Sequence, residues 1–145
     1  MTGLTAAVRE FLSAGTRTAK LGFTASDGRP LVAPVWFVVE GTDDAPELLF
    51  NTARNTAKGR AIQRDPRLAL CVDSEQPPYG FVQVQGMATW TEDPAELLRS
   101  ATAIGARYMG AERAEEFGRR NGVPGELLVR LRPTRVLAQM EVTGS

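Results

Sequence analysis

A β-hairpin pattern near the start of the chain constrains the fold more than any other feature. From Thr18 to Ser26, apolar and polar residues alternate with a period of two, which is typical of a half-buried strand. The Asp27-Gly28 pair that follows favours a tight turn between antiparallel strands. The return segment, Pro30 to Val39, is almost entirely apolar. We therefore expect it to be buried on both faces, between a barrel interior and a helix or partner subunit.

Pro34 lies in the middle of this apolar return segment. Proline has no backbone N–H to donate to a neighbouring strand, so it is rare in the centre of a sheet. The residue therefore indicates a sheet edge, a bulge, or a place where something other than a strand approaches the backbone.

The rest of the chain is also mostly β-structure joined by short turns. Further strands are predicted at Glu47–Thr52, Arg67–Asp73, Tyr79–Thr91, Glu126–Leu131 and Thr134–Val142, with Pro133 interrupting the last two. Helices are predicted at Thr5–Ala14, Thr56–Arg64, Pro94–Tyr108 and Ala111–Arg120, and Thr5, Thr56 and Asp93 are the predicted N-caps of the first three. Strands and helices do not alternate regularly, which disfavours a doubly wound sheet. We expect a mainly β protein: one antiparallel barrel domain of six or seven strands over residues 1–145, with peripheral helices.

The lack of histidine and the single cysteine exclude many common catalytic and metal-binding arrangements. The chain has no histidine, so a Ser-His-Asp triad, a histidine base and the commonest zinc ligands are absent. Its single cysteine, Cys71, lies in the apolar run LALCV and is expected to be a buried, inert thiol. We therefore expect no metal site and no catalytic side chain, with the chemistry supplied by a bound cofactor.

The charge and hydropathy patterns limit the possible partners. Seventeen basic residues balance seventeen acidic ones, which argues against a nucleic-acid binder. No apolar run approaches the roughly 20 residues that span a bilayer, and the N-terminus lacks a secretory signal pattern. We expect a cytoplasmic protein.

The stretch from Asn51 to Arg64, NTARNTAKGRAIQR, concentrates positive charge and contains no acidic residue. Thr56 is a good N-cap, and the start of a helix offers free backbone N–H groups to an anion. Lys58 and Arg60 lie within the first turn of this predicted helix. The stretch is interpreted either as a phosphate or carboxylate site or as a solvated basic helix.

The order of these motifs resembles the pyridoxamine 5′-phosphate oxidase-like split β-barrel superfamily. The resemblance rests on the Asp-Gly hairpin, the strand PVWFVV, the short strand ending FNT, and the run TAKGRAIQRDPRLALCVD, and it covers about residues 18–136. Within that superfamily, the chain is most similar to the actinobacterial oxidoreductases that use the deazaflavin coenzyme F420. The resemblance implies a homodimer that binds its cofactor at the subunit interface.

The resemblance also implies a set of cofactor-binding residues. It matches the phosphate and ribityl portion of the cofactor to the basic stretch, and the ring system to the backbone of the proline-containing strand. The residues so implied are Ala33, Pro34, Val35, Asn51, Thr52, Thr56, Ala57, Lys58 and Arg60. Arg54 and Arg64 are left open between the charged cofactor tail and solvent.

One departure from the family pattern narrows the implied activity. Pyridoxamine-phosphate oxidases carry an arginine and a lysine on the strand that here reads LVAPVWFV, and this strand has neither. The resemblance therefore implies hydride transfer from reduced F420 to an electron-poor small molecule. The alternatives are an FMN-dependent reductase or oxidase, and a non-catalytic flavin-, deazaflavin- or haem-binding protein. The aromatic residues Trp36, Tyr79, Phe81 and Trp90 are interpreted as pocket, core or dimer interface.

Overall fold

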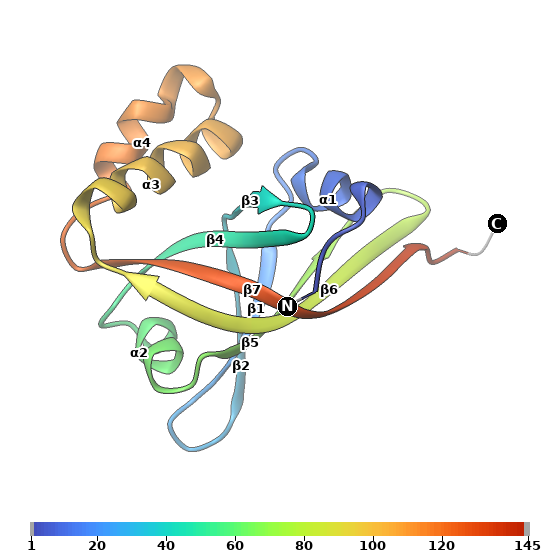
Figure 1. Cartoon of the computed structure of the whole chain (residues 1–145), viewed down its shortest axis with the longest axis horizontal. Coiled ribbons are helices and arrows are strands. Elements are labelled where there is room, and N and C mark those ends of the chain that lie inside the picture. Colours follow the sequence, from blue (N-terminus) through green and yellow to red (C-terminus); the bar gives the residue numbers. More distant parts are fainter. Residues whose placement is uncertain (1, 144–145) are drawn as a thin grey trace.

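The computed structural model describes residues 2–143 and contains one curled, antiparallel sheet (Figure 1). Its strands are β1 (Ala19–Thr24), β2 (Pro30–Val35), β3 (Val38–Thr42), β4 (Ala45–Ala53), β5 (Arg67–Asp73), β6 (Tyr79–Thr91) and β7 (Glu126–Glu141). They pair in the order β2-β1-β5-β6-β7-β4-β3. The prediction of a mainly β, antiparallel fold of six or seven strands is confirmed, and the number of strands is seven.

Four α-helices and one short 3₁₀ turn surround this sheet. They are α1 (Ala6–Ser13), α2 (Ala57–Arg64), α3 (Pro94–Met109), the 3₁₀ turn η1 (Ala111–Arg113) and α4 (Ala114–Asn121). In Figure 1, α3 and α4 lie side by side over one end of β4, and α2 lies across the sheet from them. Three predicted N-caps are present: the side chains of Thr5, Thr56 and Asp93 each accept a backbone N–H three residues later. None of the helices within residues 2–143 has the length and apolar character needed to cross a bilayer.

The prediction of a single strand from Pro30 to Val39 is wrong. The segment divides at Trp36 and Phe37 into β2 and β3, which lie at opposite edges of the sheet. Phe37 turns inward and is fully buried in the main core, which interrupts the strand. Because only two residues join the two edges, the sheet has to curl on itself at this point.

The outer side of β2 is exposed in the described chain, so the burial expected on this face stays a prediction that depends on a partner subunit. Leu31, Ala33 and Val35 contact the core, whereas Val32 is 70% exposed. The sheet order places β2 at an edge, which is one of the three interpretations of Pro34. Cys71 is likewise half-buried rather than buried.

The C-terminal strand β7 is continuous, so the predicted interruption at Pro133 is also wrong. Across β6 and β7, Gln85 pairs with Arg135 but Gly86 pairs with Pro133, which leaves Thr134 as an extra residue. This irregularity is a β-bulge, and it gives a proline a place in a long strand because the ladder is already disrupted there.

The two faces of β4 separate the main core from the layer under α3. Leu48 and Phe50 point into the main core, and Leu49 packs with Leu97 of α3 and Leu128 of β7. Asn51 continues the face of Leu49, because side chains alternate along a strand. This alternation brings Asn51 beneath α3, where the candidate site lies.

Candidate functional site

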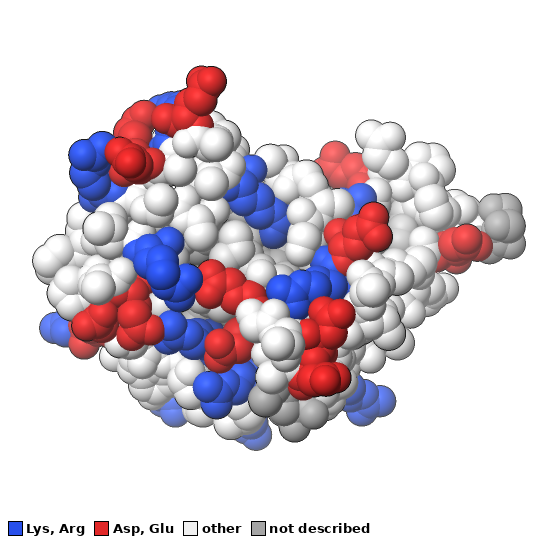
Figure 2. Space-filling view, turned by 45° about the horizontal axis from the view of Figure 1, so that its top comes forward, with Lys and Arg blue, Asp and Glu red and all other residues white. Residues whose placement is uncertain are grey.

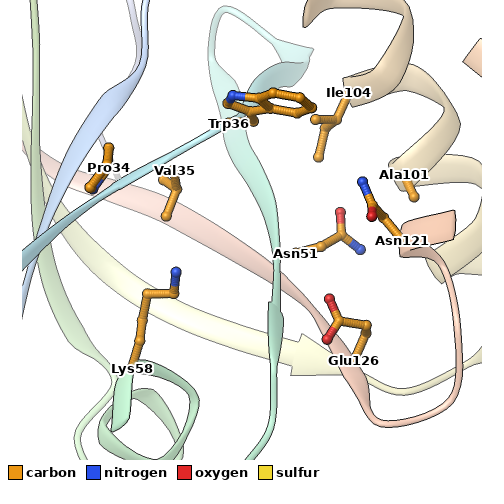
Figure 3. A pocket seen from close by; sticks show the side chains of 9 residues that line it. All are labelled: Pro34, Val35, Trp36, Asn51, Lys58, Ala101, Ile104, Asn121 and Glu126. Atoms are coloured by element: carbon orange, nitrogen blue, oxygen red, sulfur yellow. The ribbon is translucent and has the colours of Figure 1, made fainter. Parts of the chain in front are cut away.

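A pocket of about 270 Å³ lies between β2, β4 and α2 on one side and α3, α4 and β7 on the other (Figure 3). Its lining residues are Pro34, Val35, Trp36, Asn51, Lys58, Ala101, Ile104, Asn121 and Glu126. They come from six elements and from the link between β2 and β3, so the pocket depends on the complete sheet.

Lys58 reaches into this pocket from the first turn of α2 (Figure 3). The helix packs tightly on the turn before it, because a Cβ atom built on Gly59 would lie 2.1 Å from the carbonyl oxygen of Ala53. Burial lowers the pKa of the Lys58 amino group, and the carboxylate of Glu126 offsets part of this effect. The pocket therefore holds a partly desolvated cation, which favours a bound anion.

The N-terminus of α2 adds backbone donors beside Lys58. The Thr56 hydroxyl donates to the carbonyl oxygen of Ala53 at 2.8 Å and accepts the N–H of Gly59 at 3.1 Å. In the described part of the chain, the backbone N–H groups of Ala57 and Lys58 have no acceptor. These two groups are the helix donors that the cap leaves for an anion.

An apolar wall faces the cation. Pro34, Val35 and Trp36 form one side, and Ala101 and Ile104 of α3 extend it (Figure 3). Such a surface suits a flat, apolar ring system.

Asn51 presents an unpaired acceptor on the same side as α3. Its Nδ2 group donates to Ser100 Oγ at 3.3 Å, and Ser100 Oγ donates in turn to the carbonyl oxygen of Leu97 at 3.1 Å. Because the Ser100 proton is used on Leu97, the Asn51 amide has to direct its N–H group toward Ser100. Asn51 Oδ1 is then buried without a donor among the described residues.

Glu126 supplies the negative charge of the pocket. It is the first residue of β7, and its carboxylate points into the cavity opposite Lys58 (Figure 3). Burial raises the pKa of the Glu126 carboxyl, and Lys58 counteracts part of this shift. Neither Lys58 nor Glu126 takes part in an ion pair shorter than 4.0 Å within residues 2–143.

The structure brings four of the nine predicted site residues together in this pocket: Pro34, Val35, Asn51 and Lys58. Ala33 packs against the main core, and Thr52 is buried on the side of β4 opposite Asn51. The alternation of a strand explains the placement of Thr52, because neighbouring residues face opposite sides. Ala33 shares its face with Val35 but does not line the pocket.

The remaining predicted residues belong to α2 and its approach. Thr56 is the helix cap, and Ala57 and Arg60 are exposed and do not line the pocket. The two arginines left open have protein partners, since Arg54 pairs with Glu92 at 2.9 Å and Arg64 donates to the Thr24 carbonyl oxygen at 2.8 Å. Figure 2 shows basic and acidic side chains mixed in the same way over the face that it draws.

Five lining residues were not among the predicted site residues: Trp36, Ala101, Ile104, Asn121 and Glu126. The sequence leaves Trp36 open between pocket, core and dimer interface. The two α3 residues follow the apolar spacing of a packed helix, and nothing in that spacing marks a pocket. Glu126 offered one signal, as an acidic residue that opens a strand after the Pro124-Gly125 turn.

The family model described as pyridoxamine 5′-phosphate oxidase matches residues 4–140. The chain belongs to the pyridoxamine 5′-phosphate oxidase family. A comparison with curated proteins gives no significant match.

Solved structures share the fold of this pyridoxamine 5′-phosphate oxidase family member at low identity. A conserved hypothetical protein from Mycobacterium tuberculosis is 22% identical, with a TM-score of 0.77, over 94% of this chain and 85% of that one. A protein described as an F420 reductase is 24% identical, with a TM-score of 0.65, over 88% of this chain and 94% of that one. General stress protein 26 from Bacillus anthracis is 18% identical, with a TM-score of 0.62, over 87% of this chain and 86% of that one.

Proposed function

We propose that this protein is an F420-dependent oxidoreductase that transfers a hydride from the reduced deazaflavin to an electron-poor small molecule. The observation that carries the proposal is the placement of Lys58, a half-buried cation at a helix start, opposite the apolar wall at Pro34, Val35 and Trp36. A phosphorylated cofactor with a flat ring has both of these chemical features.

The pocket residues fit such a cofactor by their donors and their shape. Lys58 and the free N–H groups of Ala57 and Lys58 would hold the phosphate, and Asn51 would bond to the polar chain. The apolar wall would hold the ring and exclude water from it. When bound, the reduced deazaflavin supplies the hydride, so the protein contributes mainly binding and orientation.

The comparisons support this proposal at the level of family and fold. The family model is described as an oxidase, and one structure with the same fold is described as an F420 reductase. An FMN-dependent reductase or oxidase is the second candidate, because FMN offers the same combination of a phosphate and a flat ring.

We extend the proposal to a homodimer formed through the outer side of the sheet. Val32 and Leu137 are 70% and 52% exposed, and the strand registers place both on the side of the sheet away from the core, together with Met87. A second copy of the chain is the proposed partner. Light scattering should give twice the chain mass, Val32→Glu should reduce it to one chain, and Val123→Glu, an exposed change in a turn, should leave it unchanged.

The function is tested by titrating the purified protein with oxidised and reduced F420, with FMN and with haem. Tight binding of F420, followed by steady oxidation of the reduced form with enones or quinones, is the expected result. A lack of F420 binding would refute the proposal. Binding without turnover of any acceptor would favour a storage protein, and a flavin spectrum in the protein as purified would favour the FMN alternative.

A further inference from the structure

The hydrogen-bonding groups of the pocket are unbalanced. Lys58 is the only charged donor among the lining residues, whereas Asn51 Oδ1 and the two carboxylate oxygens of Glu126 are acceptors. The described residues place no donor on these three atoms, of which Asn51 Oδ1 is fully buried and the Glu126 carboxylate is half-buried. The Asn121 amide brings one donor group and one acceptor, so it leaves this imbalance unchanged.

A buried acceptor without a donor is unfavourable, and native structures usually satisfy it. Here the unpaired acceptors and the unpaired cation line the same cavity, and Lys58 and Glu126 extend into it from opposite sides (Figure 3). The space between them is therefore suited to a group that meets both needs at once.

We infer that the pocket selects ligands in which a hydroxyl or N–H donor stands next to an anionic group. The anion pairs with Lys58, and the neighbouring donor bonds to Glu126 and Asn51. This inference rests on the proposed function and narrows its ligand class to phosphate esters that carry a hydroxyl group beside the phosphate, with Glu126 as the residue that selects them.

The charges give the reason for this selection. A bare phosphate gains from Lys58 but is repelled by Glu126, so its net attraction to the pocket is small. A donor beside the phosphate turns the carboxylate from a repelling group into a hydrogen-bond acceptor. Glu126 therefore sets specificity rather than overall affinity.

Two probes of equal charge and similar size test this inference. Glycerol 3-phosphate has two hydroxyl groups next to its phosphomonoester, and propyl phosphate has none. The chain has two tryptophans, so the Trp90→Phe variant leaves Trp36 in the pocket wall as the single fluorescent reporter. We expect glycerol 3-phosphate to bind about tenfold more tightly than propyl phosphate. Equal binding of the two probes, or binding of neither, would overturn the inference.

A matched pair of variants assigns the selectivity to Glu126. Glu126→Gln should raise the affinity for propyl phosphate about fivefold and remove most of the preference for glycerol 3-phosphate. Glu92→Gln makes the same change in net charge at an exposed residue paired with Arg54, and should keep the preference. A preference retained in Glu126→Gln would contradict the assignment.

The test separates this inference from the proposed function. A preference for glycerol 3-phosphate without F420 binding refutes the F420 assignment and supports the selectivity of the pocket. F420 binding with no difference between the two probes supports the F420 assignment and refutes the selectivity of the pocket.

Discussion

The indole ring of Trp36 lies parallel to the phenol ring of Tyr108, with the ring centroids 4.9 Å apart and 4° between the planes. The Tyr108 hydroxyl donates to the carbonyl oxygen of Arg17 at 2.7 Å and accepts the N–H of Phe37 at 3.2 Å. One side chain of α3 thus fixes both the pocket wall and the link between the two sheet edges. The arrangement couples the orientation of Trp36 to the closure of the sheet.

Replacing Tyr108 with phenylalanine separates these two roles. The stacking surface for Trp36 remains, but the Phe37 N–H loses its acceptor in a partly buried position. We expect Tyr108→Phe to lower the free energy of unfolding by about 1–3 kcal/mol and to change ligand affinity little. Denaturant unfolding measures the loss, and Tyr79→Phe, at an exposed tyrosine, is the control. Equal losses in the two variants would mean that the Tyr108 hydroxyl is not important for stability.

Lys58 and Arg60 are two residues apart but occupy different environments. Lys58 lines the pocket, whereas Arg60 is exposed on α2 and does not line it. Lys58→Ala is expected to weaken F420 or FMN binding by roughly 1.5–3 kcal/mol, because a charge-assisted hydrogen bond is lost. Arg60→Ala should have a much smaller effect in the same fluorescence titration. If both variants keep wild-type affinity, the basic helix is only a solvated surface.

The stability of the protein should depend on pH through Glu126. Burial holds the pKa of this carboxyl above its unfolded value, and Lys58 offsets this in part. Stability from the neutral acid is therefore fully present below the unfolded pKa and is lost as the pH rises through the folded pKa. Glu126→Gln, which stays neutral, is expected to melt at a higher temperature than the wild type at neutral pH. This advantage should vanish below about pH 4, and melting curves across the acidic range measure it. A difference that does not change with pH would show that titration of Glu126 is not its source.

Gly59 reverses the usual effect of alanine in a helix. An alanine normally stabilises a helix relative to glycine, but here the added Cβ would meet the Ala53 carbonyl oxygen. We expect Gly59→Ala to destabilise the fold by about 1–3 kcal/mol and to shift the start of α2, which would also weaken anion binding. Thermal unfolding measures the first effect, with Arg60→Ala as a control on the same helix. An increase in melting temperature would refute the close packing of this turn.

Local patterns in the sequence predicted most of the fold. Period-two alternation, the turn after Ser26 and the caps at Thr5, Thr56 and Asp93 each depend on neighbouring residues, and the structure contains them. The break at Trp36 and Phe37 was missed because PVWFVV is apolar throughout. Only the distant contacts with Arg107 and Tyr108 distinguish this link from a strand.

The candidate site was predicted only in part, because local patterns indicate some of its residues and distant strand pairing places the others. Lys58 and Asn51 stand out in a basic stretch, and Pro34 in an apolar strand. Glu126 enters the pocket only because β7 pairs with β4, where Glu126 lies opposite Ala53. A pairing between residues so far apart in the sequence leaves no local pattern. The turn before Glu126 could therefore be predicted, but its place opposite Lys58 could not.

The position of β7 also has a consequence for synthesis of the chain on the ribosome. This strand follows the other six in the sequence and is made after them, yet it lies between β6 and β4, and it is the element that connects the two halves of the sheet. Until it emerges, the nascent chain has two separate groups of strands, each with an unpaired edge, and no pocket between them. The ligand site thus comes into existence only after β7 has been made, and a nascent chain that stops before β7 has no means of binding its ligand.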